Sequence, residues 1–212
     1  MIVREGLRAL LEAEGDIAVV GEAQDGRQVV QLARRLRPAV IVMDIAMPLL
    51  NGLEATRRIQ KAVPAARVLI LSAHSDDEYI RQVVTLGAAG YLVKQTSADL
   101  LSEAIREVAK GNTFFSSSVA HRLHDLYPPF HGRAAVRKEE PVLSSREVEV
   151  LQLVAEGNAN KQVAVELGIS IKTVEKHRQH LMSKLDLHDT AGLTRYAIAA
   201  GIIESRVQVT IL

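Results

Sequence analysis

The sequence contains no cysteine, which excludes disulfide bonds, thiolate metal ligands and cysteine nucleophiles together. It also has little net charge, since 26 lysines and arginines oppose 25 aspartates and glutamates and leave a formal charge of +1. Any binding of nucleic acid must therefore come from a local basic patch rather than from a global field. No apolar run approaches the ~20 residues that a membrane span needs, and the first residues lack the apolar core of a signal peptide. We therefore expect a cytoplasmic protein that does not enter a membrane.

Two domains are predicted from the way the pattern changes along the 212 residues. Residues 1–126 alternate helical periodicity with short apolar runs rich in β-branched residues, which is typical of a parallel sheet covered by helices. In residues 127–141, prolines, a glycine and mixed charges interrupt both periods, which indicates a linker. Residues 142–212 are helical almost to the end. The expected fold is an α/β domain followed by an all-α domain.

The first domain is expected to alternate between helix and strand, beginning with a helix. Its strands are expected at 17–21, 40–44, 68–72 and 91–93. Its helices are expected at 3–14, 26–36, 53–63, 76–86 and 98–110. Pro38 and Pro64 support these bounds, because each lies just before a strand, where a helix must already have ended.

The second domain carries the pattern of a helix-turn-helix. Ser144 and Glu147 have the spacing of a capping box directly ahead of an apolar helical run. Two further helices are expected at 160–167 and 171–185, and Gly168 lies in the three-residue turn between them. A glycine there can adopt the left-handed conformation that ends a helix. Two short helices joined by such a turn are typical of domains that place their second helix in the DNA major groove.

The helix expected at 171–185 has a polar, basic face. Its apolar positions Val174, Leu181 and Leu185 recur at helical spacing and are expected to face the core. The candidate contacts to duplex DNA are Lys172, Thr173, Lys176 and Gln179, flanked by His177 and Arg178. Long cations meet phosphates, and polar side chains meet base edges. A solvated amphipathic helix is the alternative interpretation, but a capped helix, a glycine turn and a basic helix in this order favour DNA binding.

These residues also carry a resemblance to a known family. Segments 143–151, 157–164, 169–178 and 184–185 resemble the LuxR-type helix-turn-helix signature. The resemblance implies a four-helix domain that binds promoter DNA as a homodimer. The residues that it places near the DNA are Lys172, Thr173, Lys176, His177 and Arg178. It also implies a dimer contact on the last helix, 189–200, where an apolar face holds Leu193, Tyr196 and Ala197.

Polar residues follow the expected strands of the first domain. Asp44 comes directly after the apolar run 40–43, Ser72 ends the next strand, Lys94 follows the last one, and Tyr91 lies just inside it. In an open parallel sheet, functional groups gather at the carboxyl ends of the strands. A carboxylate there, with a lysine to neutralise charge and a serine to hydrogen-bond an oxygen, is suited to accepting a phosphoryl group. The alternative is structural: the aspartate caps the next loop and pairs with the lysine.

Segments 43–48, 51–52, 69–73 and 87–94 together resemble a response-regulator receiver domain. The resemblance covers about residues 2–110 and implies a flavodoxin-like parallel sheet. It implies Asp44 as the phosphoacceptor, Ser72 and Tyr91 as a switch pair, and Lys94 as the characteristic lysine of the site. With its second domain, the whole chain resembles a two-component response regulator of the NarL/FixJ type, whose partner is a sensor histidine kinase.

One departure from the receiver pattern concerns Mg²⁺. A receiver begins with a strand that ends in two acidic residues, which hold the ion, whereas here Arg4 to Leu11 already matches the family's first helix. Asp44 and the Ala46 carbonyl alone are expected to bind Mg²⁺ poorly, because the ion needs near-octahedral oxygen coordination. Either the true start lies upstream and the sheet is truncated at its N-terminal side, or the receiver is degenerate. The first interpretation is favoured because the rest of the site is intact.

The sequence therefore predicts a DNA-binding transcriptional regulator that is gated by phosphorylation at Asp44. A second hypothesis is a phosphorylation-independent regulator or interaction protein, which titrates partner receivers through a truncated domain. A third is a phosphotransferase with an aspartyl nucleophile, a class that usually needs another aspartate two residues further on. Ala46 occupies that position, which argues against an enzyme.

Overall fold

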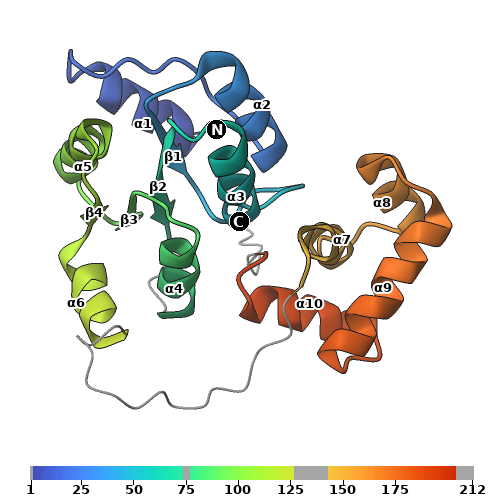
Figure 1. Ribbon diagram of the computed structural model, residues 1–212. Helices are drawn as coiled ribbons and strands as arrows, with labels where there is room; N and C mark the ends of the chain where they lie inside the picture. Colours follow the sequence, from blue (N-terminus) through green and yellow to red (C-terminus); the bar gives the residue numbers. More distant parts are fainter. Residues whose placement is uncertain (1, 74–76, 127–142, 204–212) are drawn as a thin grey trace, which may run out of the picture. The chain divides into compact units, whose positions relative to one another are not determined.

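A computed structural model describes residues 2–73, 77–126 and 143–203 (Figure 1). The chain divides into two compact units, one built around a sheet and one made of helices. The predicted linker, 127–141, lies outside the described residues. Within the described ranges, no helix combines the length and the apolar character needed to cross a membrane.

The first unit alternates helices with strands, as the sequence predicts. Its helices are α1 (Ile2–Glu12), α2 (Gly26–Leu36), α3 (Gly52–Ala62), α4 (Asp77–Thr85), α5 (Ala98–Lys110) and α6 (Ser117–Leu126). Its strands are β1 (Val40–Met43), β2 (Arg67–Ser72), β3 (Gly90–Val93) and β4 (Phe114–Phe115). The strands form a parallel sheet in the order β1-β2-β3-β4, so each strand pairs with the next one in the chain.

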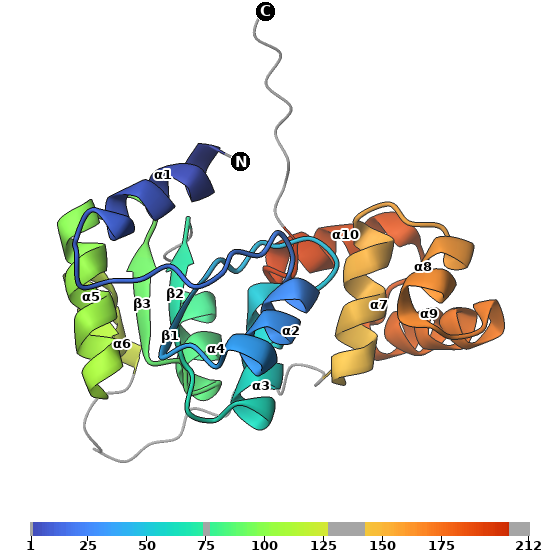
Figure 2. The same cartoon turned by 90° about the horizontal axis from the view of Figure 1, so that it is seen from above.

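The sheet is covered by helices on both faces. Leu69 and Leu92 point to one face, where they pack in a common core with Leu101 and Val108 of α5. Leu7 of α1 packs against the same core, and Figure 2 shows α1 and α5 on one side of the sheet, with α3 and α4 on the other. The alternation of side chains along a strand thus supplies both apolar layers of the α/β domain.

The strand predicted at 17–21 is not formed, which corrects the sequence prediction. Residues 17–23 connect α1 to α2 and form neither helix nor strand, and β1 pairs with β2 alone among the described strands. An apolar segment becomes a strand only when its backbone groups find a ladder partner. Side chains hold this one instead: Ile17 packs on the α5 core, and Arg4 of α1 donates to Glu22 at 2.8 Å.

Two elements at the end of this unit, β4 and α6, were not predicted. The strand β4 has only two residues, which is too short for a detectable period, yet Phe114 pairs with Gly90 and Phe115 with Tyr91 of β3. A Cβ atom on Gly90 would overlap the Phe114 carbonyl oxygen. The glycine therefore permits the close approach that lets β4 join the sheet.

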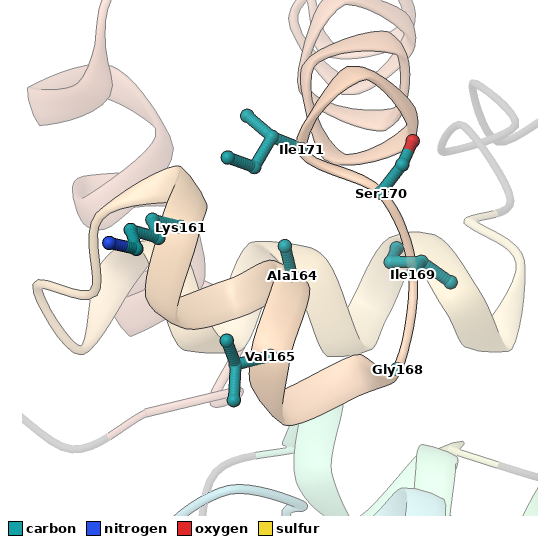
Figure 3. A pocket seen from close by; sticks show the side chains of 7 residues that line it. All are labelled: Lys161, Ala164, Val165, Gly168, Ile169, Ser170 and Ile171. Atoms are coloured by element: carbon teal, nitrogen blue, oxygen red, sulfur yellow. The ribbon is translucent and has the colours of Figure 1, made fainter.

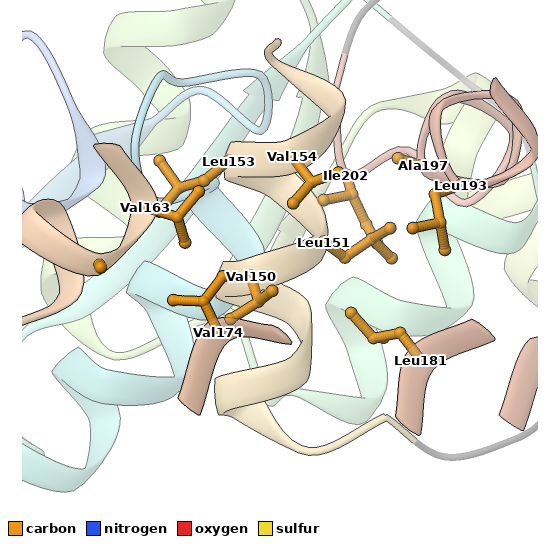
Figure 4. Close-up of a cluster of buried hydrophobic side chains, with 11 residues drawn as sticks. Val150, Leu151, Leu153, Val154, Val163, Val174, Leu181, Leu193, Ala197 and Ile202 are labelled. Carbon is orange, nitrogen blue, oxygen red and sulfur yellow. The ribbon is translucent and has the colours of Figure 1, made fainter. Parts of the chain in front are cut away.

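The second unit contains α7 (Ser145–Ala155), α8 (Asn160–Leu167), α9 (Ile171–Leu185) and α10 (Thr190–Ala199). Side chains cap three of these helices: Ser144 for α7, Ser170 for α9 and Asp189 for α10. The residues that form the common core (Figure 4) are Val150, Leu151, Leu153, Val154, Val163, Ala164, Val174, Leu181, Leu193, Ala197 and Ile202. The expected four-helix arrangement is thereby confirmed.

Candidate functional sites

The first candidate site lies at the carboxyl edge of the parallel sheet. Asp44 follows β1, Ser72 ends β2, and Lys94 follows β3. The Lys94 Nζ donates to Asp44 Oδ2 at 2.6 Å, and the Ala46 amide donates to the other carboxylate oxygen at 3.3 Å. The Lys94 amide also donates to the Ser72 carbonyl at 2.7 Å, which holds the ends of β2 and β3 together.

The residues of this site differ in their access to solvent. The side chains of Asp44 and Lys94 are each 33% exposed, whereas Ser72 and Tyr91 are buried. A reagent can therefore reach the carboxylate and the ammonium, but not the interior pair. The structure brings Asp44 and Lys94 into direct contact and places Tyr91 inside β3.

Gly52 contributes to the site in a way that the sequence analysis did not recognise. It is the first residue of α3, and its amide donates to the Ile45 carbonyl at 2.8 Å. A Cβ atom at this position would overlap the Asp44 carbonyl oxygen. The close approach of α3 thus helps to fix the backbone that carries the carboxylate. The only signal in the sequence was the Asn51-Gly52 pair within the receiver resemblance.

The donors at this site do not by themselves fit a magnesium ion. Asp44 is the one carboxylate among the three strand-end residues, and its Oδ2 is already bonded to Lys94. In the part of the chain that the structure describes, no group of three or more histidine or acidic side chains lies close enough to hold a metal. Mg²⁺ needs near-octahedral oxygen coordination, and one carboxylate with the Ala46 carbonyl leaves most of that shell unfilled.

The second candidate site is the outer face of α9. Lys172, Lys176 and Gln179 are exposed on the side opposite the buried Val174 and Leu181. A helix repeats every 3.6 residues, so the three polar positions line one stripe along its length. This stripe agrees with the face that the sequence predicts.

Thr173 and Ser170 are engaged with each other at the start of α9. Their hydroxyl oxygens lie 2.8 Å apart, and the Ser170 hydroxyl accepts from the Thr173 amide at 3.1 Å. The bond from the amide caps the helix, and the Thr173 hydroxyl is engaged with the capping side chain.

Arg178 is also held within its domain rather than displayed with the exposed lysines. One guanidinium nitrogen donates to Asn160 Oδ1 of α8 at 2.8 Å, and the other donates to Thr190 Oγ1 of α10 at 2.7 Å. The side chain therefore links three helices. His177 is likewise half-buried on this flank of α9.

Glu147 and Lys184 tie α9 to α7. The Lys184 Nζ donates to Glu147 Oε2 at 2.7 Å, and the same carboxylate accepts from the Ser144 amide at 2.8 Å. Burial by itself would raise the pKa of Glu147, but the hydrogen bonds from Lys184 and Ser144 outweigh burial and lower the pKa to about 2. Lys184 is thus a structural partner of α7.

The predicted dimer contact on α10 was wrong for two of its three residues. Leu193 and Ala197 are fully buried in the core of their own domain, where they pack with Leu151 and Leu181 (Figure 4). Tyr196 is half-buried against the same core. The i, i+3, i+4 spacing predicted an apolar face for dimerisation, whereas in the structure this face packs α10 on the core of its own domain.

Comparisons with known proteins place both units in described families. Residues 1–106 match the response regulator receiver domain, and residues 141–197 match the luxR family of bacterial regulatory proteins. The transcriptional regulatory protein MctR of Rhizobium johnstonii is 40% identical over 202 residues, which are 95% of this chain and 91% of that protein.

Two solved structures are similar over nearly the whole chain. The response regulator ChrA of a heme-sensing two-component system is 33% identical, with a TM-score of 0.50 over 95% of this chain and 94% of that one. RcsB of Salmonella enterica serovar Typhimurium, solved on promoter P1flhDC with the phosphomimetic BeF3⁻, is 26% identical with a TM-score of 0.56 and the same coverage.

The two units therefore define a transcriptional regulator in which a receiver domain is joined to a LuxR-type DNA-binding domain. Proteins of this class are generally regulators of transcription and not enzymes. The chain belongs to the two-component response regulators of the NarL/FixJ type.

Proposed function

We propose that Asp44 is the phosphoacceptor of this regulator and that a cognate sensor histidine kinase supplies the phosphoryl group. The observation that carries the proposal is the contact between a partly exposed carboxylate and the Lys94 ammonium at the carboxyl edge of the sheet. The carboxylate is accessible as a nucleophile, and the cation is close enough to neutralise oxygens transferred to it.

In the transfer, an Asp44 carboxylate oxygen forms a bond to phosphorus while the bond from phosphorus to the kinase imidazole breaks. The imidazole nitrogen leaves with the electron pair of that bond and takes up a proton from solvent. Lys94 then neutralises phosphoryl oxygens, and the Ser72 hydroxyl donates a hydrogen bond to one of them. Receiver domains generally bind Mg²⁺, but the donors described at Asp44 do not make such a site, so no step is assigned to the ion.

Ser72 and Tyr91 are proposed to transmit the conformational change that follows phosphorylation of Asp44. Both side chains are buried, on neighbouring strands of the sheet. When the Ser72 hydroxyl turns to a phosphoryl group, the packing around Tyr91 changes, and with it the surface formed by β3 and α4. Phosphorylation thereby favours the state in which the DNA-binding domain is released or dimerises.

The DNA-binding function is assigned to residues 142–212, with 1–126 as the receiver and 127–141 as the linker. The exposed stripe of Lys172, Lys176 and Gln179 enters the major groove, where the lysines meet phosphates or guanines. RcsB, to which this chain is similar, was solved bound to promoter DNA and as dimers on DNA. We infer a homodimer on DNA here as well, and a cytoplasmic location, since the proposed ligand is the promoter.

The dimer contact is proposed to lie on the outward side of α10. Arg195 and Ile198 are exposed there, one turn of the helix apart, whereas Leu193 and Ala197 are used by the core. An exposed isoleucine beside an arginine is the kind of pair that protein interfaces favour.

A second candidate function is a regulator that works without phosphorylation. The bond between Lys94 and Asp44 favours it, because the carboxylate already has a cationic partner. In this case the receiver is a fixed interaction domain, and the affinity of the whole chain for DNA does not change when a phosphodonor is added.

The two candidates are separated by treating the full chain with phosphoramidate and measuring its intact mass and its affinity for a selected operator. We expect slow gain of one phosphoryl group, tighter operator binding, and neither effect in Asp44→Asn, because an amide is not a nucleophile. Lys94→Gln keeps the nucleophile and should reduce the rate. Absence of any added mass in the folded chain, with unchanged operator affinity, would support the phosphorylation-independent regulator instead. A gain that persists in Asp44→Asn would show that another residue is the phosphoacceptor.

A further inference from the structure

An apolar pocket opens between α8 and the first turn of α9 (Figure 3). Ala164 and Val165 line it from α8, and Ile169 and Ile171 line it from the turn and from α9. Two of these side chains are unusually exposed for their size: Val165 at 77% and Ile171 at 44%. Lys161 lies at the rim. The pocket is thus a small apolar surface with a cation beside it.

Ile171 lies at the N-terminal end of α9, the helix that is proposed to enter the major groove. It is the first residue of the helix, directly after the capping Ser170, and the N-terminal residues of such a helix contact base edges. The exposed Lys172 follows it in the chain. The apolar pocket is therefore continuous with the cationic stripe that is proposed to enter the major groove.

The polar groups of this turn are already engaged. The Ser170 hydroxyl accepts from the Thr173 amide and bonds the Thr173 hydroxyl. Apart from Lys172, the exposed side chain offered by the first turn is the apolar Ile171. The apolar feature that a base pair presents in the major groove is the C5-methyl group of thymine.

We propose that Ile171 reads a thymine in each operator half-site by packing against its C5-methyl group, with Lys161 near the flanking phosphate. This proposal rests on the proposed binding of DNA through α9. It assigns a sequence-specifying role to an apolar residue that the sequence analysis did not include among the DNA contacts. Because Ile171 is exposed, the fold does not require its side chain.

The test uses the full chain and an operator selected from a random duplex pool. Each thymine of that operator is replaced in turn by deoxyuridine, which keeps every hydrogen-bonding group and removes only the methyl. We expect one position per half-site where the replacement weakens binding about fourfold, the value of one buried methyl group. At that position, Ile171→Ala should bind the thymine and deoxyuridine operators alike.

Leu10→Ala is the matched control, because Leu10 on α1 is exposed to a similar extent, at 50%, belongs to no proposed binding surface, and should keep the fourfold preference. If binding is salt-sensitive but no deoxyuridine replacement weakens it, the proposed contact with a thymine methyl is wrong, whereas DNA binding through α9 is still supported. A preference that survives in Ile171→Ala also overturns it. If Ile171→Ala alters transcription but not DNA affinity, the pocket docks a protein and the proposal is wrong. If the unaltered chain binds no operator from the pool, the proposed function itself is contradicted.

Discussion

At the scale of single residues, Arg178 shows how a helix face can mislead. Its sequence neighbours Lys176 and Gln179 point to solvent, but its own guanidinium bonds Asn160 and Thr190. Each of those residues is the first residue of a helix. Arg178 therefore positions the starts of α8 and α10 relative to α9, and its effect on DNA binding passes through that arrangement.

Arg178→Gln is expected to lower the free energy of unfolding by about 1–3 kcal/mol, because it removes hydrogen bonds to a charged group and leaves their partners behind. Operator affinity should fall, while the slope of log K against log salt stays the same, since no phosphate contact is lost. Lys176→Gln is the control: its stability should be unchanged, and its slope should fall by about 0.9 if the lysine meets a phosphate. The measurements are thermal unfolding and a salt titration of operator binding. A shallower slope in Arg178→Gln would show that this arginine contacts DNA directly.

At the scale of elements, the bounds of helices that begin after a capping residue were predicted closely. The bounds of α2, α5, α8 and α9 agree with the prediction to the residue. Asp25, Ser97 and Ser170 cap three of them through bonds to the following amides. A cap is a local signal, because the side chain and the amides that it satisfies lie within three residues. Such boundaries can be predicted from sequence alone.

Features that depend on distant partners could not be predicted in this way. Residues 17–21 have the composition of a strand but have no strand beside them to pair with. Phe114 and Phe115 form a strand only because β3 lies beside them. The positions of Asp44 and Lys94 in one site could be predicted from the ends of the expected strands, because parallel strands bring their carboxyl ends to one edge of the sheet. The burial of Leu193 depends on α7, some forty positions away, and the sequence could not show which surface covers an apolar stripe.

The two sides of α10 should respond differently to the same substitution. Leu193→Arg places a charge in the core of the domain and should cost more than about 3 kcal/mol, enough to unfold it. Ile198→Arg lies on the outward side and should leave thermal unfolding unchanged. It should nevertheless weaken binding to an operator with two half-sites and not to a single half-site. Equal affinity of Ile198→Arg and the unaltered chain for the double site would place the dimer contact elsewhere.

At the scale of the whole molecule, each unit contains its own apolar core. The core of the second unit is made of buried residues from α7 to Ile202, and the ion pair between the buried Glu147 and the exposed Lys184 joins its first and third helices. The interactions that hold the DNA-binding surface in place are therefore local to that unit.

The fragment 142–212 is accordingly expected to fold by itself and to bind promoter DNA. Its log K should fall linearly with log salt, with a slope near −0.9 per phosphate contact, because bound cations release counterions from the DNA. Circular dichroism reports its fold, and fluorescence anisotropy its affinity. A folded fragment that shows no salt-sensitive binding to any promoter pool would contradict the assignment of the DNA site.

The strand order of the sheet has a consequence for synthesis on the ribosome. Because β1, β2, β3 and β4 pair in the order in which they emerge, each new strand can add to an edge that is already present, and none has to wait for a later one. The first helix is the exception: Leu7 and Leu11 pack against the α5 core, and Asp16 bonds Arg106, 90 positions further on. Helix α1 therefore docks only after α5 has been synthesised, and until then its apolar side is free to be bound by a chaperone.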